Sequence, residues 1–229
     1  MRLFLFDIDG TLVQSGGAGR VALAAALREV FGTAGPLETY DLRGRTDPRI
    51  VLDVMCAAGF TETEVRARLE ATFAAYLREL APLVAEPGRV RLHPGMAGVV
   101  RALAEREDAL VGLLTGNIEA GARVKLGPTG LWPLFQVGAF GSDHTDRRQL
   151  PAVATARARA RTGREFSFAR VTIIGDTPLD VDCARACGAF AVAVATGSHP
   201  HADLEACAPD LLFADFSDVD AVLAALTKP

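Results

Sequence analysis

Short apolar runs alternate with longer amphipathic segments along most of the chain, and this alternation limits the possible folds more than any other feature of the sequence. Each run is bounded by Gly, Pro, Asp or Thr; the runs cover residues 3–6, 109–114, 136–140, 171–174, 190–195 and 211–213. Continuously apolar strands are typical of a parallel sheet that is covered on both faces.

Helical patterns fill most of the intervals between these runs. They cover residues 97–107, 151–162, 178–187 and 219–226. Strands that alternate with helices imply right-handed crossovers between parallel strands. The sequence therefore predicts an α/β fold with a doubly wound parallel sheet.

One region departs from this alternation. Residues 15–89 show helical periodicity and no convincing strand, and Thr61 with Glu64 forms a capping box ahead of a long helix. A helical block of this size after the first strand is best explained as a second, smaller domain. We therefore expect an α/β core made of residues 1–14 and 90–229, and an inserted all-helical domain made of residues 15–89.

Composition excludes several classes of protein. Of the 229 residues, 50% are hydrophobic and 23% are charged, which argues against a disordered chain. The formal net charge of −4 provides no global basic field for a nucleic acid backbone. No segment approaches the roughly 18 consecutive apolar residues of a membrane span. We expect a cytoplasmic protein without nucleic acid or membrane partners, present as a monomer or homodimer.

Polar and charged residues follow directly after three of the predicted strands. The segments are Asp7-Ile8-Asp9-Gly10-Thr11, Thr115-Gly116-Asn117 and Gly175-Asp176-Thr177-Pro178-Leu179-Asp180. Two acids at the end of a buried strand cost free energy unless they meet a cation or a reacting group. A hydroxyl group and loop N–H groups can bind phosphate oxygens. Ligands of doubly wound sheets bind beyond the carboxyl ends of the strands, so these segments should share one crevice.

In order and spacing, these segments resemble three of the four motifs of the haloacid dehalogenase superfamily. The resemblance covers almost the whole chain, and the helical block lies where that family carries its inserted cap. It is strongest to small phosphatases of the phosphoglycolate phosphatase type. It implies a Mg²⁺-dependent phosphatase that hydrolyses a small phosphorylated metabolite, a phosphomonoester, through an aspartyl-phosphate intermediate.

The resemblance implies a role for each of three acids. Asp7 is the expected nucleophile, and its second carboxylate oxygen is expected to bind Mg²⁺. Asp9 is expected to offer its backbone carbonyl to the metal, while its side chain protonates the leaving alcohol and then deprotonates the attacking water. This double role predicts a raised pKa for Asp9. Asp176 would complete the metal ligands that the protein supplies.

Other residues of the motifs have more than one interpretation. Thr115, with Gly116 and Asn117, is expected to bind the phosphate group, although a threonine at a strand end is common. Thr11 is either a turn residue or a supporting residue of the first motif. Asp180 is either the capping acid of the helix that begins at Pro178 or a metal-site residue, and both roles can hold together.

The third motif departs from the family pattern. A Lys is expected roughly 30 residues after Thr115, but the chain has Asp146-Arg147-Arg148 there. We expect Arg147 to take the role, ahead of Arg148, since a guanidinium keeps the positive charge. Lys125 is the third candidate, but its position on the following helix suggests a surface residue.

The inserted segment carries Gly44-Arg45-Thr46-Asp47, which resembles the part of the family's cap that points into the active site. Arg45 could contact an anionic substrate tail, and Thr46 could hydrogen-bond to it. The alternative is that Thr46 only caps the next helix.

Two other functions are compatible with the sequence. A β-phosphoglucomutase-like phosphomutase shares both motif-one acids and the helical insert. A catalytically silent phosphate-binding protein of the same family would explain the Arg in the third motif. Dehalogenase chemistry is disfavoured because it does not need Asp9, and a phosphonatase is disfavoured because residues 15–89 contain no Lys.

Overall fold

The computed structural model describes residues 1–228 and contains a six-stranded parallel sheet. In spatial order the strands are β5 (Val137–Ala139), β4 (Ala109–Leu114), β1 (Arg2–Phe6), β6 (Val171–Gly175), β7 (Phe190–Val194) and β8 (Leu211–Phe213). The predicted runs thus form the strands, with bounds that differ by at most one residue at either end. Strand β1 pairs with β4 on one side and with β6 on the other, so the chain reverses its direction of winding beside β1.

Helices cover both faces of the sheet. One face packs against α4 (Met96–Ala104), α5 (Glu119–Leu126) and α9 (Val219–Leu226). The opposite face packs against α6 (Leu150–Thr162), α7 (Pro178–Cys187) and α8 (His201–Ala206). The doubly wound α/β fold is therefore confirmed, and helix α8 is an element that the sequence patterns did not predict.

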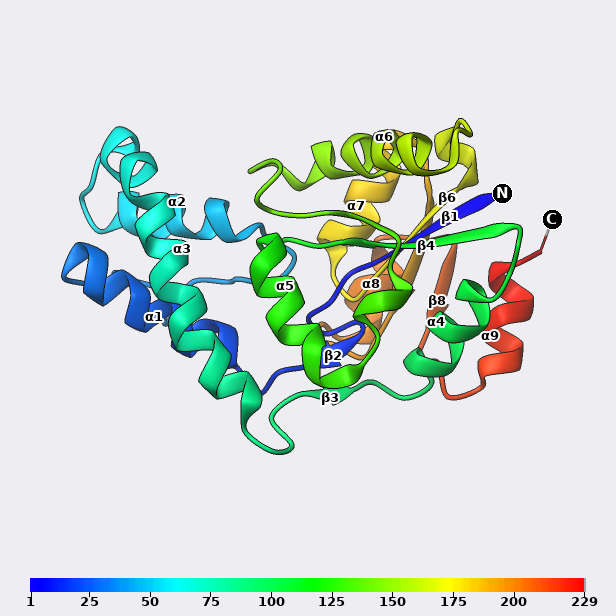
Figure 1. Ribbon diagram of the computed structural model, residues 1–229, viewed down its shortest axis with the longest axis horizontal. Coiled ribbons are helices and arrows are strands. Elements are labelled where there is room, and N and C mark those ends of the chain that lie inside the picture. Colours follow the sequence, from blue (N-terminus) through cyan, green and yellow to red (C-terminus); the bar gives the residue numbers. More distant parts are fainter. Residues whose placement is uncertain (229) are drawn as a thin grey trace.

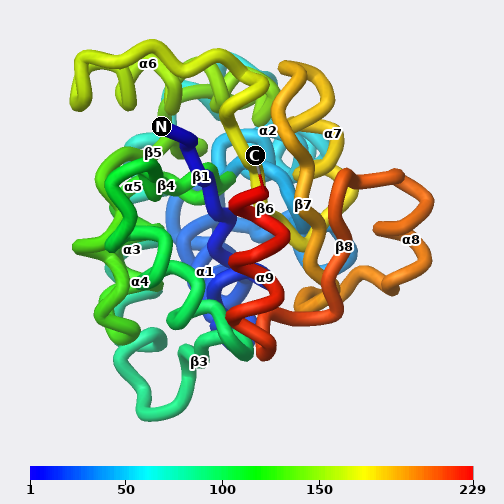
Figure 2. The backbone as a smooth tube through the Cα atoms, turned by 90° about the vertical axis from the view of Figure 1, so that its right-hand side faces the viewer, coloured from blue at the N-terminus to red at the C-terminus, as the bar shows by residue number. Residues whose placement is uncertain are grey.

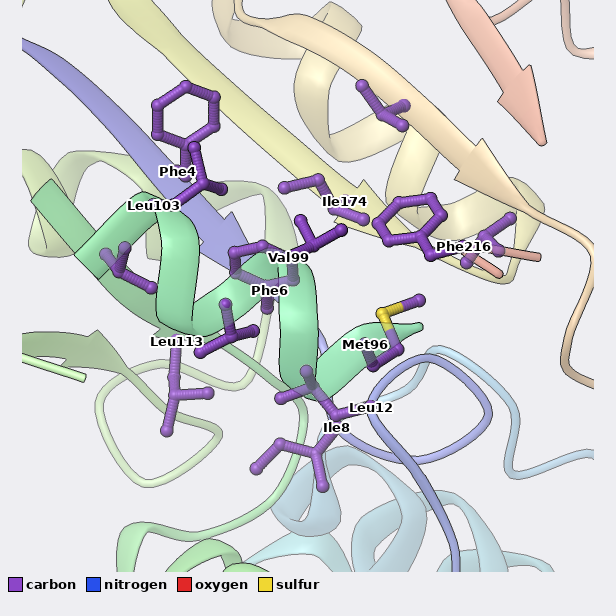
Figure 3. Packing of buried hydrophobic residues seen from close by; sticks show 14 of the residues in the cluster. Phe4, Phe6, Ile8, Leu12, Met96, Val99, Leu103, Leu113, Ile174 and Phe216 are labelled. Carbon is purple, nitrogen blue, oxygen red and sulfur yellow. The ribbon is translucent and has the colours of Figure 1, made fainter. Parts of the chain in front are cut away.

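The alternation of side chains along β1 explains why both faces need a cover. Leu3 and Leu5 belong to the apolar cluster on one face, whereas Phe4 and Phe6 belong to the cluster on the other. Figure 3 shows Phe4 and Phe6 beside Val99 and other apolar side chains of the second cluster. Burial of large apolar side chains on both faces is the main force that stabilises a central parallel strand.

The helical insert follows β1 and the short strand β2 (Val13–Gln14), and consists of α1 (Ala18–Phe31), α2 (Asp47–Ala57) and α3 (Glu62–Ala85). These helices have an apolar cluster of their own and lie beside the carboxyl ends of the sheet strands (Figure 1). The predicted capping box of Thr61 and Glu64 begins α3.

A two-stranded antiparallel ribbon joins the insert to the sheet. Strand β2 pairs with β3 (Arg91–Leu92) through the register Val13 with Leu92 and Gln14 with Arg91. Strands of two residues are too short to give a recognisable alternation, so the sequence did not predict the ribbon. The predicted domain boundaries at residues 15 and 89 lie close to this ribbon, and the division into two domains stays a prediction.

The first residues of the chain and the end of α9 lie together at the side of the sheet remote from the insert, as Figures 1 and 2 show. The Arg2 guanidinium donates hydrogen bonds to the carbonyl oxygens of Leu226 and Lys228, over 2.9 and 2.7 Å. Because the strands are parallel, the carboxyl ends of β1, β4 and β6 all meet at the opposite edge of the sheet, beside the insert.

Candidate active site

A cavity of about 560 Å³ lies between the carboxyl ends of the strands and the helical insert. Its core-side walls include Asp7, Asp9, Thr115, Asn117, Lys125, Arg147 and Asp176, and its insert-side walls include Arg45, Asp47, Ile50 and Tyr76. The three polar strand ends therefore share one crevice, at the point where the winding of the sheet reverses.

Three carboxylates cluster at the carboxyl ends of the strands, and two of them, Asp7 and Asp176, line the cavity. Asp7, Asp176 and Asp180 are buried, and an oxygen of each lies within 4.8 Å of the others. Burial raises the pKa of Asp7 to about 6, with Arg147 opposing and Asp180 adding to the effect. Burial, followed by the charges of Asp180 and Asp7, raises the pKa of Asp176 well above its usual value. Buried carboxylates that destabilise one another are a donor set suited to a hard divalent cation.

Neighbouring backbone and a threonine fix Asp176 in this cluster. The Thr11 hydroxyl donates to Asp176 Oδ1 over 3.0 Å. A Cβ atom at Gly10 or at Gly197 would lie 2.3 or 1.7 Å from Asp176 Oδ2, so both positions must be glycine for the carboxylate to fit. Thr11 therefore supports an acid of the site, in addition to lying in the turn after β1.

Asp180 uses its two oxygens for different partners. Oδ2 accepts hydrogen bonds from the Thr177 N–H and hydroxyl groups, over 3.0 and 2.7 Å, which completes the capping box of α7. Oδ1 accepts a hydrogen bond from Arg147 Nη2. The capping role is confirmed, while a role for Asp180 at the metal stays a prediction.

Arg147 lies in a short 3₁₀ helix, η3 (Arg147–Gln149), and only 7% of its side chain is exposed. Its Nη2 atom is 3.3 Å from Asp7 Oδ1 and 3.3 Å from the Leu114 carbonyl oxygen. Arg148 instead forms an ion pair with Asp182 on the surface, with an Nε to Oδ2 distance of 2.7 Å. Of the two arginines, the geometry favours Arg147 for contact with the nucleophile.

The prediction of a surface position for Lys125 is wrong. Only 6% of its side chain is exposed, and Nζ lies 2.6 Å from Asp9 Oδ2 and 2.6 Å from Asn117 Oδ1. The buried residues of α5 are Gly121, Ala122, Lys125 and Leu126. This one-face spacing is the sequence signal that could have placed Lys125 inside, because Ala122 and Leu126 mark the buried side of the helix.

The expected direction of the Asp9 pKa shift is also wrong in this arrangement. Burial by itself would raise the pKa of Asp9, but the Lys125 charge and hydrogen bonds from Lys125, Asn117 and Ser15 lower it overall. Because the sequence suggested a surface position for Lys125, it indicated no cation beside Asp9. Lys125 therefore favours the charged form of Asp9.

The loop after β4 carries the groups expected to bind phosphate. Thr115 is buried at the strand end, and its Oγ1 accepts hydrogen bonds from the Asn117 side-chain amide over 2.8 Å and the Asn117 N–H over 3.3 Å. A Cβ atom at Gly116 would lie 2.0 Å from the Arg45 carbonyl oxygen. This glycine therefore allows the insert to approach the loop closely.

Hydrogen bonds join residues 46 and 47 of the insert to the core and to the first turn of α2. The Thr46 hydroxyl donates to the Thr145 carbonyl oxygen over 2.6 Å and accepts from the Arg49 N–H over 3.3 Å. The Asp47 N–H donates to the Gly116 carbonyl oxygen over 2.7 Å, and Asp47 Oδ2 accepts from the Ile118 N–H over 2.8 Å. Thr46 does cap α2, and with its hydroxyl engaged twice, a contact with substrate is not favoured.

Arg45 lies at the cavity wall with part of its guanidinium held by the insert. Its Nε donates to the Asp41 carbonyl oxygen over 3.1 Å, and its Cζ lies 5.4 Å from the centre of the Tyr40 ring. This arrangement orients the side chain, and its contact with a substrate stays a prediction.

Comparison with known proteins establishes the family. Residues 4–185 match the model of the haloacid dehalogenase-like hydrolases, so the chain belongs to this family. It is 32% identical over 222 residues to a phosphoglycolate phosphatase of Synechococcus elongatus, covering 96% of this chain and 95% of that protein. A phosphoglycolate phosphatase of Cereibacter sphaeroides is 29% identical over 201 residues, with 86% of each chain covered.

Solved structures agree on the fold. A predicted phosphoglycolate phosphatase from Haemophilus somnus superimposes with a TM-score of 0.69 at 20% identity, covering 97% of this chain and 98% of that one. By its family and its relatives, the chain is a phosphatase of the haloacid dehalogenase-like hydrolases. The family and the acidic triad together indicate a divalent metal ion. Among residues 1–228, no helix is both long and apolar enough to cross a membrane.

Proposed function

We propose that this protein is a Mg²⁺-dependent phosphatase that hydrolyses a small phosphomonoester through an aspartyl-phosphate on Asp7. The observation that carries the proposal is the placement of Asp7. Its carboxylate is buried at the end of β1, with Arg147 Nη2 3.3 Å from Oδ1 and with Asp176 in the same acidic cluster. A nucleophilic carboxylate needs such neighbouring positive charge before a phosphate dianion can approach.

The residues that would hold Mg²⁺ are Asp7, Asp176 and the backbone carbonyl of Asp9. When bound, Mg²⁺ would supply positive charge that offsets the repulsion between the carboxylates and the substrate phosphate. The other groups proposed for phosphate binding are the Arg147 guanidinium, the Thr115 hydroxyl and the loop N–H groups of Gly116 and Asn117. All of these residues line the cavity together with Asp7, where the phosphoryl group of the substrate would be attacked.

Asp9 is proposed to move the protons in both steps. It would protonate the leaving oxygen when Asp7 attacks phosphorus, and it would take a proton from the water that hydrolyses the aspartyl-phosphate. The low pKa that Lys125 imposes suits the second step, which needs the charged form. In the first step, the negative charge of the bound phosphate acts in the opposite direction and favours the protonated form.

Phosphoglycolate is the first substrate to test. Support comes from the two relatives named phosphoglycolate phosphatase, which match most of this chain. The Arg45 guanidinium at the cavity wall is the group proposed to meet the carboxylate end of such a substrate.

The test is phosphate release from a panel of phosphomonoesters that includes phosphoglycolate, in the presence of Mg²⁺ or of EDTA. The matched control is Asp7→Asn, which keeps the side-chain shape and removes the nucleophilic charge. We expect turnover with Mg²⁺ that disappears with EDTA and in the variant. Turnover that survives in Asp7→Asn would exclude Asp7 as the nucleophile. A wild-type protein that turns over no ester until an activating sugar bisphosphate is added would instead be a phosphomutase.

A further inference from the structure

Lys125 is a buried cation in the cavity wall that contacts the phosphate loop as well as Asp9. Its Nζ reaches Asp9 Oδ2 and Asn117 Oδ1, each over 2.6 Å. The first turn of α1 approaches the same ammonium group from the insert, since a Cβ atom at Gly19 would lie 3.3 Å from Nζ and 3.6 Å from the Tyr76 hydroxyl oxygen. The side chain of Lys125 is therefore confined on several sides.

The chemistry of the ammonium group fixes the orientation of the Asn117 amide. A protonated lysine has three donors and no acceptor, so the Asn117 atom that faces it must be the oxygen. The amide nitrogen then points the other way, where it donates to Asp9 Oδ2 over 2.9 Å and to Thr115 Oγ1 over 2.8 Å. Were the amide reversed, its NH₂ group would face the ammonium group, and its oxygen, an acceptor, would face Asp9 and the Thr115 hydroxyl.

The orientation of Asn117 in turn determines what the Thr115 hydroxyl can do. Thr115 Oγ1 accepts two hydrogen bonds, from the side-chain amide and from the backbone N–H of Asn117. With both acceptor positions in use, the hydroxyl takes part in further bonding only as a donor. Within residues 1–228 its hydrogen has no protein acceptor, and Thr115 lines the cavity. A phosphoryl oxygen, which only accepts, is the complementary partner.

We propose that Lys125 is a positioning residue that fixes the Asn117 amide and thereby directs the Thr115 hydroxyl hydrogen toward the phosphoryl group. This inference rests on the proposed function, since it requires a phosphoryl group in the cavity. Lys125 lies on α5, whereas the loop it organises follows β4, so the helix and the loop act as one unit in phosphate binding.

The experiment measures binding of beryllofluoride, a phosphoryl mimic, to the Mg²⁺-loaded protein by calorimetry, together with kcat and KM for the best substrate of the panel. The variants are Lys125→Met, Thr115→Val and the double variant. Lys228→Met is the matched control, because Lys228 is the other lysine of the chain and is exposed. Mg²⁺ binding without beryllofluoride and thermal unfolding are measured for each protein.

We expect Lys125→Met and Thr115→Val each to weaken beryllofluoride binding about tenfold or more, the usual effect of losing a hydrogen bond to a charged group. If Lys125 acts through Thr115, the double variant should bind beryllofluoride at most about threefold more weakly than whichever single variant has the lower affinity. The kcat of Lys125→Met should fall while Mg²⁺ binding is retained. Lys228→Met should behave as the wild type.

Two results would overturn the inference while leaving the proposed function intact. The first is beryllofluoride binding by Lys125→Met that stays within about twofold of the wild type. The second is a double variant whose loss of beryllofluoride affinity equals the product of the losses in the two single variants. If the wild type itself neither binds beryllofluoride nor turns over an ester, the proposed function fails first. Should Lys125→Met not fold, Asn117→Leu replaces it, because it removes the amide and keeps Lys125. Asn117→Leu must then show the same loss and the same lack of additivity with Thr115→Val.

Discussion

Arg147 Nη2 lies 3.3 Å from Asp7 Oδ1 and also hydrogen-bonds to Asp180 Oδ1, so one guanidinium joins the expected nucleophile to the capping acid of α7. The same Nη2 atom makes both contacts, while Nη1 donates to the Gly44 carbonyl oxygen over 3.2 Å, so the guanidinium keeps its positive charge beside Asp7. The presence of Arg where the family pattern has Lys is therefore compatible with a working site.

This relationship predicts the effect of removing Arg147. Arg147→Ala leaves Asp7 and Asp180 without their shared cation and should lower kcat/KM by about a hundredfold or more, in the range of lost electrostatic stabilisation. Arg148→Ala removes only a surface ion pair with Asp182 and should stay within about threefold of the wild type. Steady-state kinetics on the same substrate compare the two. A larger loss for Arg148→Ala would move the third motif to that residue.

Asp9→Asn separates the two proton transfers assigned to Asp9. On an alkyl phosphate, kcat should fall by about 10²–10⁴, the usual contribution of general acid–base catalysis. On p-nitrophenyl phosphate the leaving group needs no proton, so a burst of nitrophenolate should precede a slow steady state. Rapid-mixing absorbance measurements detect the burst. A steady-state rate on the alkyl ester close to that of the wild type would show that Asp9 is not the acid–base group.

The close approach of the insert to Gly116 predicts that a larger residue at this position destabilises the protein. A Cβ atom there would lie 2.0 Å from the Arg45 carbonyl oxygen, so Gly116→Ala must displace the insert from the loop. We expect a loss of about 1–3 kcal/mol in the free energy of unfolding, as for other overpacked sites, and a lower kcat/KM. Gly127→Ala is the control, because no atom lies within 4 Å of its added Cβ. Equal unfolding temperatures for the two variants would contradict the described contact.

The raised pKa of Asp47 predicts that the free energy of unfolding depends on pH. Burial is the main cause that raises its pKa to about 6, against the opposing charge of Lys125 and the hydrogen bond from Ile118. A carboxyl with a raised pKa in the folded state binds protons more readily there than in the unfolded state, so its contribution to stability falls as pH rises from about 4 to about 6.

The matched variant for this prediction is Asp47→Asn, whose amide oxygen can still accept the Ile118 hydrogen bond. Relative to the wild type, the variant should gain stability as pH rises through that range, by at most about 3 kcal/mol. Denaturant unfolding of both proteins at several pH values provides the difference. A difference that does not change with pH would show that the pKa of Asp47 is near its usual value.

The strands and the first-motif acids were predictable because their causes are local. A continuously apolar run such as residues 171–174 can only be satisfied by cover on both faces, and Asp7 follows such a run directly. The capping acid Asp180 was predictable for the same reason, since its partner Thr177 is three residues away.

The position of Lys125 was not predictable in the same way, because its cause is not local. Its partners Asp9 and Asn117 belong to different strand ends, and Gly19 belongs to the insert. Only the assembled sheet brings them to the buried face of α5. The direction of the Asp9 pKa shift was missed as a consequence, since it follows from the Lys125 charge.

The most direct test of the central claim is to identify the residue that carries the phosphoryl group during turnover. The wild type is mixed with substrate and Mg²⁺, quenched in acid and digested, and the modified peptide is sequenced by mass spectrometry. The account predicts a phosphorylated peptide modified at Asp7, and no modified peptide from Asp7→Asn. A phosphoryl group on another residue would contradict the account. So would turnover with no phosphorylated peptide when the wild type is quenched within a single turnover.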